Sequence, residues 1–421
     1  MTEETEPLLS NRVFQKYFGL SLSATSASSV VSLVIIWYVY SVTHSAIDLT
    51  IIGVTETLAA VIISLPAGVW IDRHDRIKLL ILSNVVRTSA VALIVVLTRF
   101  FGFNLIAIVL LLFAWNGAAE LYRSSSYAVL PDLVGSEKLA DANGIVRSAS
   151  NLLRSGSNAI GGALIVVVGA SLAFSYGAFG FLIALIFSLS LVGYNKKLKG
   201  IEKPANAKKA NGLSEIREGL AWLLSQRGLL WLTLSCLIFN FFFTASYYFL
   251  VVYVSSGLHA GSLVYGEILA SFAIGYAIGS TLVGRARWSL IYAGRVWTLV
   301  YGAGVGASLL LMSLFLYSIL GILFYFIAGT CAGFAGNVWL TSAQNIVPAE
   351  MRGRYFAIDG LISFIGGPPA IAAGGVLVLT IHIIPLYELS GIIMVLSGVG
   401  FSLIKSLWML NGTSPQRVEQ K

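Results

Sequence analysis

The sequence predicts an all-α membrane protein with twelve transmembrane helices in two pseudo-symmetric six-helix bundles. Hydrophobic residues make up 57% of the 421 positions, charged residues make up 11%, and the mean hydropathy is +0.85. A soluble domain carries about 25% charged residues, so this composition excludes an ordinary soluble protein. The two further observations are the number of long apolar runs and a single long polar linker in the middle of the chain.

Twelve apolar runs are long enough to cross a bilayer, because a transmembrane helix needs about 20 apolar residues. The first run is too long for a signal peptide and has no small-residue cleavage site, so we expect it to remain as the first helix. The predicted spans are 15–42, 46–70, 78–98, 104–127, 138–168, 171–194, 229–254, 260–284, 290–316, 318–346, 353–380 and 385–409.

The long linker at 195–213 is rich in Lys and contains Pro204 and Gly212, so it cannot stay in hydrocarbon. It divides the chain into an N-terminal six-helix bundle at 1–194, a cytoplasmic linker at 195–213, and a surface helix with the C-terminal six-helix bundle at 214–421. Ser214–Ser225 begins with an N-cap Ser and continues with an amphipathic pattern. This pattern predicts a helix that lies along the membrane surface.

Basic residues gather in the loops on one side of the predicted bundle. Because Lys and Arg resist translocation, their distribution predicts a multi-pass protein of the cell membrane with both termini in the cytoplasm. The net charge of +8 then reflects a basic face attracted to anionic lipid, and we expect no nucleic-acid partner. The residues on the basic side are Arg73, Arg76, Lys78, Lys138, Lys196 to Lys209, Arg285, Arg287, Arg352 and Arg354, against Arg99 on the other.

The most informative motif is a short charged segment between the second and third spans. Gly68, Asp72, Arg73 and Arg76, with a basic residue displaced to Lys78, match the loop signature G-x-x-x-D-R-x-x-R-[KR]. In this motif the sequence resembles the major facilitator superfamily, and helix number, central linker and repeated halves extend the resemblance across essentially the whole chain. The resemblance implies alternating access, in which two helix bundles rock about a central cavity.

Charges in this segment predict a latch at the cytoplasmic gate. Asp72 can interact with the positive N-terminal end of a neighbouring helix, which the resemblance places at the eleventh helix. Arg76 needs an acidic partner, and we expect Asp132 at the end of the fourth helix to supply it. A weaker echo of the motif at Ser280–Arg285 retains only the basic residue, so the halves are not equivalent.

The stretch from Leu130 to Gly162 most resembles the branch of the family that contains macrolide, multidrug and siderophore exporters. Exporters of this kind carry G-P-x-x-G-G in the fifth helix, whereas Ser157–Gly162 keeps only the glycine pair. This departure leaves the direction of transport open. In the eleventh span, Gly366–Pro369 and Gly374 with Gly375 supply residues suited to a kink and close packing.

Ionisable residues inside spans are costly, so they mark candidate coupling sites. Glu56 lies about 15 Å into the second helix, where removal from water favours a carboxyl that binds protons reversibly. The alternative is a Glu with a purely structural hydrogen bond or ion pair. Glu120 and Arg123 share one face of the fourth helix. They can form a static pair, or the pair can open when Glu120 is protonated or substrate competes for Arg123.

Arg147 and Arg154 lie on one stripe of the fifth helix. This stripe can hold an anionic group of a substrate, or each Arg can neutralise a buried acid such as Glu120 or Glu56. Arg87 in the third span does not fit the peripheral place that the resemblance gives to that helix.

The resemblance implies that the first and seventh helices line the cavity. Candidate cavity residues are Phe239, Asn240, Phe243 and Tyr247 of the seventh span, with Asn116 of the fourth. Aromatic side chains there suit a bulky, lipophilic and cationic solute. The alternative is lipid contact or an interfacial aromatic belt. To that belt we assign Trp37, Tyr38, Tyr40 and Tyr253.

Together these features predict a secondary transporter that exports lipophilic or amphiphilic small molecules in exchange for protons, by alternating access. The alternative is an uptake symporter or uniporter for a small metabolite on the same fold. The sequence has no Walker motif, no metal or nucleophile constellation and no sign of a cofactor, so we expect neither an ATP-driven pump nor an enzyme. We expect a monomer in the lipid bilayer whose partners are its substrate and protons.

Overall fold

The computed structural model describes residues 8–135, 138–194, 212–286, 288–348, 351, 355, 358–360, 362, 366–408 and 410. Within these ranges every regular element is a helix. Eleven described helices are long and apolar enough to cross a membrane, and Gly367–Ile381 is a shorter apolar helix. The predicted all-helical membrane fold is confirmed. The chain divides into two compact units, Met1–Ala205 and Asn206–Lys421.

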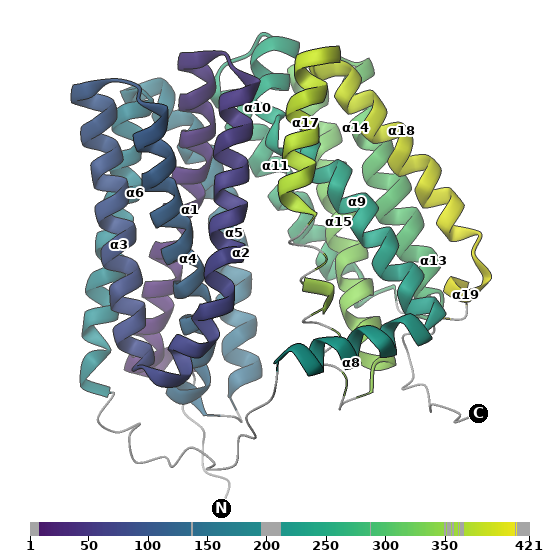
Figure 1. Ribbon diagram of the computed structural model, residues 1–421, viewed down its shortest axis with the longest axis horizontal. Helices are drawn as coiled ribbons and strands as arrows, with labels where there is room; N and C mark the ends of the chain where they lie inside the picture. Colours follow the sequence, from purple (N-terminus) through teal and green to yellow (C-terminus); the bar gives the residue numbers. More distant parts are fainter. Residues whose placement is uncertain are drawn as a thin grey trace, which may run out of the picture. The chain divides into compact units, whose positions relative to one another are not determined.

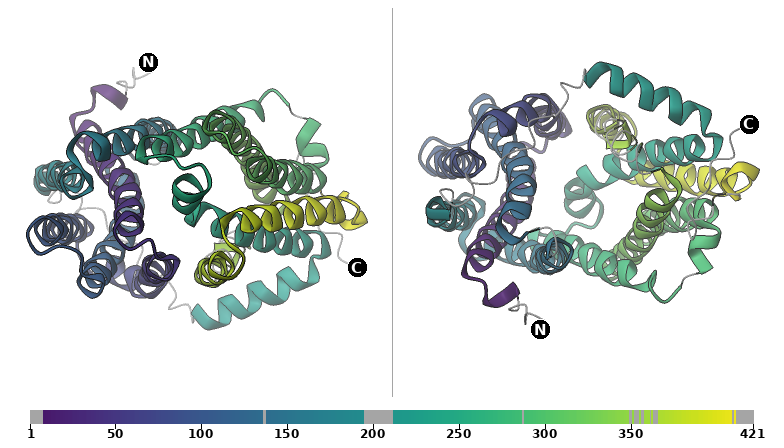
Figure 2. Two further views of the ribbon diagram at one scale, coloured as in Figure 1. Left: turned by 90° about the horizontal axis from the view of Figure 1, so that it is seen from above. Right: turned by 90° about the horizontal axis from the view of Figure 1, so that it is seen from below.

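The first unit is built from long helices that run side by side (Figure 1, Figure 2). Side-chain caps set where several of them begin: Asn11 accepts a hydrogen bond from the Val13 amide at 2.9 Å, and Asn104 accepts one from the Ala107 amide at 3.0 Å. The elements are η1 (Leu8–Ser10), α1 (Arg12–Thr43), α2 (Ala46–Arg73), α3 (Arg76–Val96), the π-helical η2 (Leu97–Phe101), α4 (Leu105–Val134), α5 (Leu139–Val168), α6 (Ala170–Ser190) and η3 (Val192–Tyr194).

Packing in this unit brings α1 against α5 and α6, and α4 against α2 and α3. Gly177 of α6 allows a close approach to α1, because a Cβ there would lie 2.2 Å from the Val31 side chain. Buried side chains of α1, α3, α4, α5 and α6 form a common core in which the Tyr17 hydroxyl bonds the Ser126 hydroxyl at 2.7 Å.

In the second unit, α8 lies across the ends of the membrane-spanning helices (Figure 1). The helix predicted at Ser214–Ser225 is present, but it already begins at Gly212, so Ser214 lies inside it and is not its N-cap. The elements are α8 (Gly212–Ser225), α9 (Arg227–Tyr248), α10 (Leu250–Val252), the π-helical η4 (Tyr253–Gly257), α11 (Ser262–Leu282), α12 (Trp288–Ile291), α13 (Ala293–Trp297), the π-helical η5 (Thr298–Val305), α14 (Gly306–Leu314), α15 (Ser318–Ile346), α17 (Gly367–Ile381), α18 (Ile383–Ser402) and α19 (Lys405–Trp408).

The predicted span 290–316 is irregular, since α13 and α14 are joined by the π-helical η5. Glycines accompany this irregularity. A Cβ at Gly302 would lie 2.7 Å from the Cα of Gly398, and a Cβ at Gly306 would lie 2.9 Å from the Gly391 carbonyl oxygen. The backbones of this span and α18 are therefore in direct contact, as small residues permit in membranes.

Two predicted segments lie partly outside the described residues. The linker at 195–213 is described only from Gly212, and the span at 353–380 forms a continuous described helix only from Gly367. Pro368 lies in the first turn of α17, where proline is tolerated. A Cβ added at Gly374 would lie 2.9 Å from the Phe249 ring. Glycine at this position therefore permits the close packing that the sequence predicts.

Candidate functional site

The loop between α2 and α3 is a tight turn held by backbone and side-chain hydrogen bonds. The His74 amide donates to the Trp70 carbonyl at 2.8 Å, which closes α2. The Asp75 carboxylate accepts from the Ile77 and Lys78 amides at 3.0 and 3.3 Å, which starts α3. Sequence reasoning missed this cap, although an Asp directly before an apolar helix is a recognised N-cap signal.

Arg76 joins this loop to the end of α4. Its Nη1 donates to Asp132 Oδ2 at 2.5 Å and to the Ala128 carbonyl at 2.8 Å, so the expected pairing with Asp132 is present. Both charged side chains are about one-third exposed, which limits the stabilisation from the ion pair itself. The exposure of Gly68 and the side chain of Asp72 lie outside the described part, and Arg73 is exposed. Their role in a cytoplasmic gate stays a prediction.

Glu120 and Arg123 form a bidentate ion pair within the α4 span. Arg123 Nε donates to Glu120 Oε2 at 2.9 Å, and Nη2 donates to Oε1 at 2.6 Å. The Ser124 hydroxyl adds a longer contact to Oε1 at 3.4 Å. The Glu120 side chain is 7% exposed, whereas Arg123 is half-exposed. The pair therefore links a buried carboxylate to a guanidinium that an outside group can reach.

Glu56 of α2 differs from Glu120 because its buried Oε1 has no hydrogen-bond partner among the described residues. Burial of an unpartnered carboxyl oxygen is costly, which favours a functional explanation for this Glu. Arg147 and Arg154 are exposed on α5, and neither forms an ion pair with a described acid. Glu120 is neutralised by Arg123 from its own helix instead.

Arg87 is a fully buried cation in the first unit, with 2% of its surface exposed. Its guanidinium carbon lies 4.1 Å from the centre of the Phe181 ring and 4.8 Å from the centre of the Tyr122 ring. One nitrogen donates to the Ser28 hydroxyl at 2.5 Å, while Nε and Nη1 have no partner among the described residues. Its sequence position revealed the charge, but the aromatic partners on α4 and α6 became visible only in the fold.

The predicted aromatic residues of α9 belong to one cluster in the second unit. The Phe239 ring stacks on Tyr301 at 5.9 Å between centroids, and the Tyr301 hydroxyl donates to Asn240 Oδ1 at 3.2 Å. Phe243 lies 6.0 Å from Tyr247 and also stacks on Phe272 of α11 at 5.4 Å. Phe239 is fully buried, whereas Tyr247 is exposed. Phe239 thus packs the interior of the unit, whereas Tyr247 is accessible on its surface.

The predicted aromatic belt is wrong for three of its four residues. Tyr253 is fully buried, stacks on Tyr387 at 4.7 Å and donates its hydroxyl to the Met312 carbonyl at 2.8 Å. Tyr38 and Tyr40 are also buried, and Tyr38 contacts Phe174 edge to face. All three rings are buried within their own unit. Asn116, the predicted cavity residue of α4, donates to the Leu112 carbonyl of its own helix at 3.1 Å.

Comparison with known proteins decides the family. The sequence profile of the Major Facilitator Superfamily matches residues 17–371. The chain belongs to the major facilitator superfamily. This transporter is 23% identical over 202 residues to macrolide efflux protein A of Streptococcus pyogenes, covering 48% of this chain and 49% of that protein. It is also 23% identical over 194 residues to the uncharacterized MFS-type transporter YvqJ of Bacillus subtilis strain 168, covering 44% of each. The chain thus matches about half the length of these relatives.

Solved transporter structures share the fold. A bacterial homologue of the iron transporter ferroportin in an inward-facing state has a TM-score of 0.69 and 16% identity, covering 93% of this chain and 99% of that one. A peptide transporter in complex with alafosfalin has a TM-score of 0.72 and 13% identity, covering 94% and 95%. At these identities the likeness establishes the transporter fold and not the substrate.

Proposed function

We propose that this transporter exports lipophilic or amphiphilic small molecules in exchange for protons. The observation that carries the proposal is the buried Glu120 held by Arg123 within a membrane span. Protonation of Glu120 removes the negative charge that holds the guanidinium, so proton binding and release of Arg123 are coupled. An anionic or strongly polar group of a substrate competes with Glu120 for the same half-exposed guanidinium.

Glu56 supplies the second proton-binding carboxyl in this proposal. Its buried oxygen lacks a hydrogen-bond partner among the described residues, so no described cation holds it in the charged form. Glu56 and Glu120 lie on α2 and α4, which pack against each other. Two carboxyls in unlike surroundings suit a cycle in which one site is proton-loaded while the other is paired.

Lipophilic cargo is supported by the aromatic residues of α9 and by the similarity to a macrolide efflux protein over about half the chain. The face on which Arg147 and Arg154 lie favours the second candidate, uptake of a small anionic metabolite, because both are exposed and pair with no described acid.

The multi-pass chain is assigned to the cell membrane, with both termini in the cytoplasm, on the distribution of its basic residues.

Reconstituted liposomes with an imposed pH gradient test this proposal. We expect the gradient to drive movement of a fluorescent amphiphilic cation or a macrolide, accompanied by counterflow of protons measured with an entrapped pH dye. Glu56→Gln and Glu120→Gln each abolish the gradient-driven component, because the amide cannot be ionised. Glu388→Gln in α18 is the matched control, since it makes the same change in another span, and it retains coupling.

Solute flux that ignores the gradient in the unmodified protein contradicts proton exchange. Gradient-driven flux that survives both glutamine variants contradicts the assigned carboxyls while leaving export intact. The same liposomes loaded with peptides, sugars and organic anions test the uptake candidate, for which Arg147→Gln and Arg154→Gln are the informative variants.

A further inference from the structure

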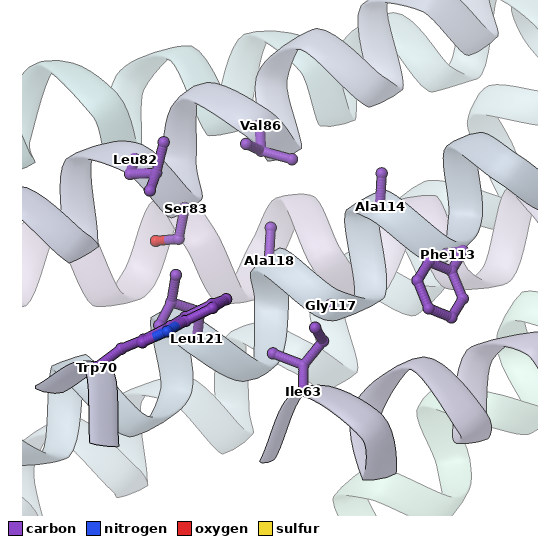
Figure 3. Close-up of a pocket in the computed structure, with 10 residues that line it drawn as sticks. All are labelled: Ile63, Trp70, Leu82, Ser83, Val86, Phe113, Ala114, Gly117, Ala118 and Leu121. Atoms are coloured by element: carbon purple, nitrogen blue, oxygen red, sulfur yellow. The ribbon is translucent and has the colours of Figure 1, made fainter. Parts of the chain in front are cut away.

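An apolar groove lies on the first unit, where α2, α3 and α4 meet (Figure 3). Figure 3 shows side chains of all three helices around it, with Trp70 towards one end and Phe113 towards the other. Its volume is about 220 Å³. The residues around it are Ile63, Trp70, Leu82, Ser83, Val86, Phe113, Ala114, Gly117, Ala118 and Leu121.

The lining offers almost no polar atoms to a ligand. Ser83 is the one hydroxyl residue in it, and its hydroxyl already donates to the Leu80 carbonyl at 2.8 Å. Apolar cavities of about 150 Å³ that are lined by aliphatic and aromatic side chains stay free of water and take apolar ligands. The groove is therefore suited to a hydrocarbon group and not to water or to a polar solute.

The groove opens on an exposed face of the first unit. Leu82 is 52% exposed, Trp70 is 40% exposed and Phe113 is 38% exposed. Leu82 and Phe113 lie within the spans Arg76–Phe101 and Leu105–Val134, so their exposed surfaces are at hydrocarbon depth. A chain of hydrocarbon can enter from the bilayer without crossing a polar barrier.

One end of the groove is basic. Arg73 follows Trp70 by less than one turn of α2, and Lys78 precedes Leu82 by about 6 Å along α3. Both are exposed and neither has an ion-pair partner among the described residues. Two nearby acids are engaged elsewhere: Asp75 caps α3, and Asp132 pairs with Arg76, while the side chain of Asp72 lies outside the described part. Two cations thus stand at the end marked by Trp70, an aromatic type enriched at the level of lipid headgroups.

We propose that this groove binds one acyl chain of an anionic phospholipid whose phosphate lies against Arg73 and Lys78. The apolar lining accounts for the chain, and the adjacent pair of cations accounts for the negative headgroup. A neutral lipophilic solute would use the lining alone and leave the cations without a role. The tight glycine contacts between α11 and α15 of the second unit leave no comparable space between those two helices.

Trp70 provides the test, because bromine on a lipid chain quenches a nearby indole. The full-length protein is placed in phosphatidylcholine nanodiscs that contain increasing fractions of phosphatidylglycerol or phosphatidylcholine with 9,10-dibromostearoyl chains. The Trp70 signal is the difference between the unmodified protein and Trp70→Phe, which separates it from the other Trp residues. We expect half-maximal quenching of Trp70 at about a fivefold lower fraction of the anionic lipid.

Two variants with matched controls separate the chain from the headgroup. Ala114→Phe fills the groove and abolishes the selective quenching, whereas Leu110→Phe, on a lipid-exposed site of the same helix outside the lining, preserves it. Lys78→Gln removes most of the preference for the anionic lipid, whereas Lys405→Gln in the second unit does not. Monodisperse elution in detergent establishes that each variant is folded.

Equal quenching by the two lipids overturns the proposal, as does quenching that persists unchanged in Ala114→Phe. Recovery of Trp70 fluorescence on addition of a macrolide, to the same extent in the unmodified protein and in Lys78→Gln, would identify a path for solutes and also overturn it. These outcomes concern lipid binding and leave the pH-gradient experiment above as an independent test of transport.

Discussion

Single residues in this transporter show how a membrane fold accommodates ionisable side chains, whose burial costs free energy. Arg87 is buried between two aromatic rings, so much of its stabilisation comes from cation–π contact and little from hydrogen bonds. Glu120 is balanced by a guanidinium on its own helix, whereas Glu56 has a buried oxygen without a described partner. Buried ionisable residues thus have unlike surroundings, which distinguish the structural cation Arg87 from the candidate coupling residues Glu56 and Glu120.

Substitution of Arg87 distinguishes stacking from charge. Arg87→Lys keeps the charge but loses the planar contact with Tyr122 and Phe181, so we expect the melting temperature to fall by about 5 °C. Arg87→Met keeps the apolar stem and removes an incompletely bonded ion, so it melts at or above the temperature of the unmodified protein. Thermal unfolding in detergent provides the measurement. A lower melting temperature for Met than for Lys would show that the charge is needed for stability.

His382 holds an unfavourable backbone conformation between α17 and α18. Its φ of 67° and ψ of 179° fall in a region that is populated almost only by glycine. We expect His382→Gly to stabilise the protein by about 1 kcal/mol, after allowance for the greater freedom of glycine in the unfolded chain. His44, at φ 50° and ψ 24°, is in the milder left-handed helical region, so His44→Gly is close to neutral. Equal shifts in melting temperature for the two variants would contradict this ranking.

Pairs of helices differ in how closely they approach. In the second unit, an added Cβ on Gly275 or Gly279 of α11 would lie 2.2 or 2.0 Å from a carbonyl oxygen of α15. Gly329 and Gly333 of α15 face α11 in the same way, at 2.1 Å each. Each helix therefore packs its glycines onto the backbone of the other, which permits Cα–H···O contacts. In the first unit, an added Cβ on Gly117 of α4 meets only the Ile63 side chain, at 3.1 Å.

Gly279→Ala tests the importance of this close approach. The methyl group would force α11 and α15 apart because the obstacle is backbone, and we expect a loss of about 1–3 kcal/mol in stability. Gly400→Ala in α18 is the control, since nothing lies within 4 Å of an added Cβ there, and it is neutral or slightly stabilising. Melting temperatures in detergent report both. Equal melting temperatures for the two variants would mean that the interface yields more easily than its geometry indicates.

At the scale of the whole molecule, the two units use different contacts at related positions. Arg76 bonds both Asp132 and the Ala128 carbonyl of α4 in the first unit. In the second unit, Asn337 of α15 donates to the Ser280 carbonyl of α11 at 2.7 Å, within the weaker echo of the motif. Among the described residues, this position has a charged contact in the first unit and a neutral one in the second.

Neutralisation of Asp72 tests the gate that the family motif implies. If Asp72 stabilises the closed cytoplasmic side by meeting a helix N-terminus, Asp72→Asn favours opening inward, by up to about fivefold for such a contact. A cysteine at Asn143, in a background with Cys236 and Cys331 replaced by Ala, reports accessibility to an impermeant maleimide in inside-out vesicles. Labelling accelerates in Asp72→Asn and not in Asp48→Asn, at the other end of the same helix. An unchanged labelling rate would count against the gate.

Composition and local signals predicted much of this molecule. Long apolar runs located the spans, and the acid opposite Arg76 followed from the need of a membrane-surface Arg for a partner. The surroundings of Arg87 could not be predicted, because Ser28, Tyr122 and Phe181 come from three other helices. Tyr253 was misassigned for the same reason. Tyrosine is common at membrane interfaces, but this one is buried by contacts with Tyr387 and Met312, which are distant in sequence.

The π-helical segment Thr298–Val305 affects how the two halves of the sequence should be compared. Each extra residue that a π-turn accommodates advances the helix face by about 100° relative to an uninterrupted α-helix. Residues after Val305 are therefore out of phase with an α-helical template drawn from the start of the span. An alignment of the third span with the ninth needs a gap within this segment, or it will pair the interior side chains of one half with the lipid-facing side chains of the other.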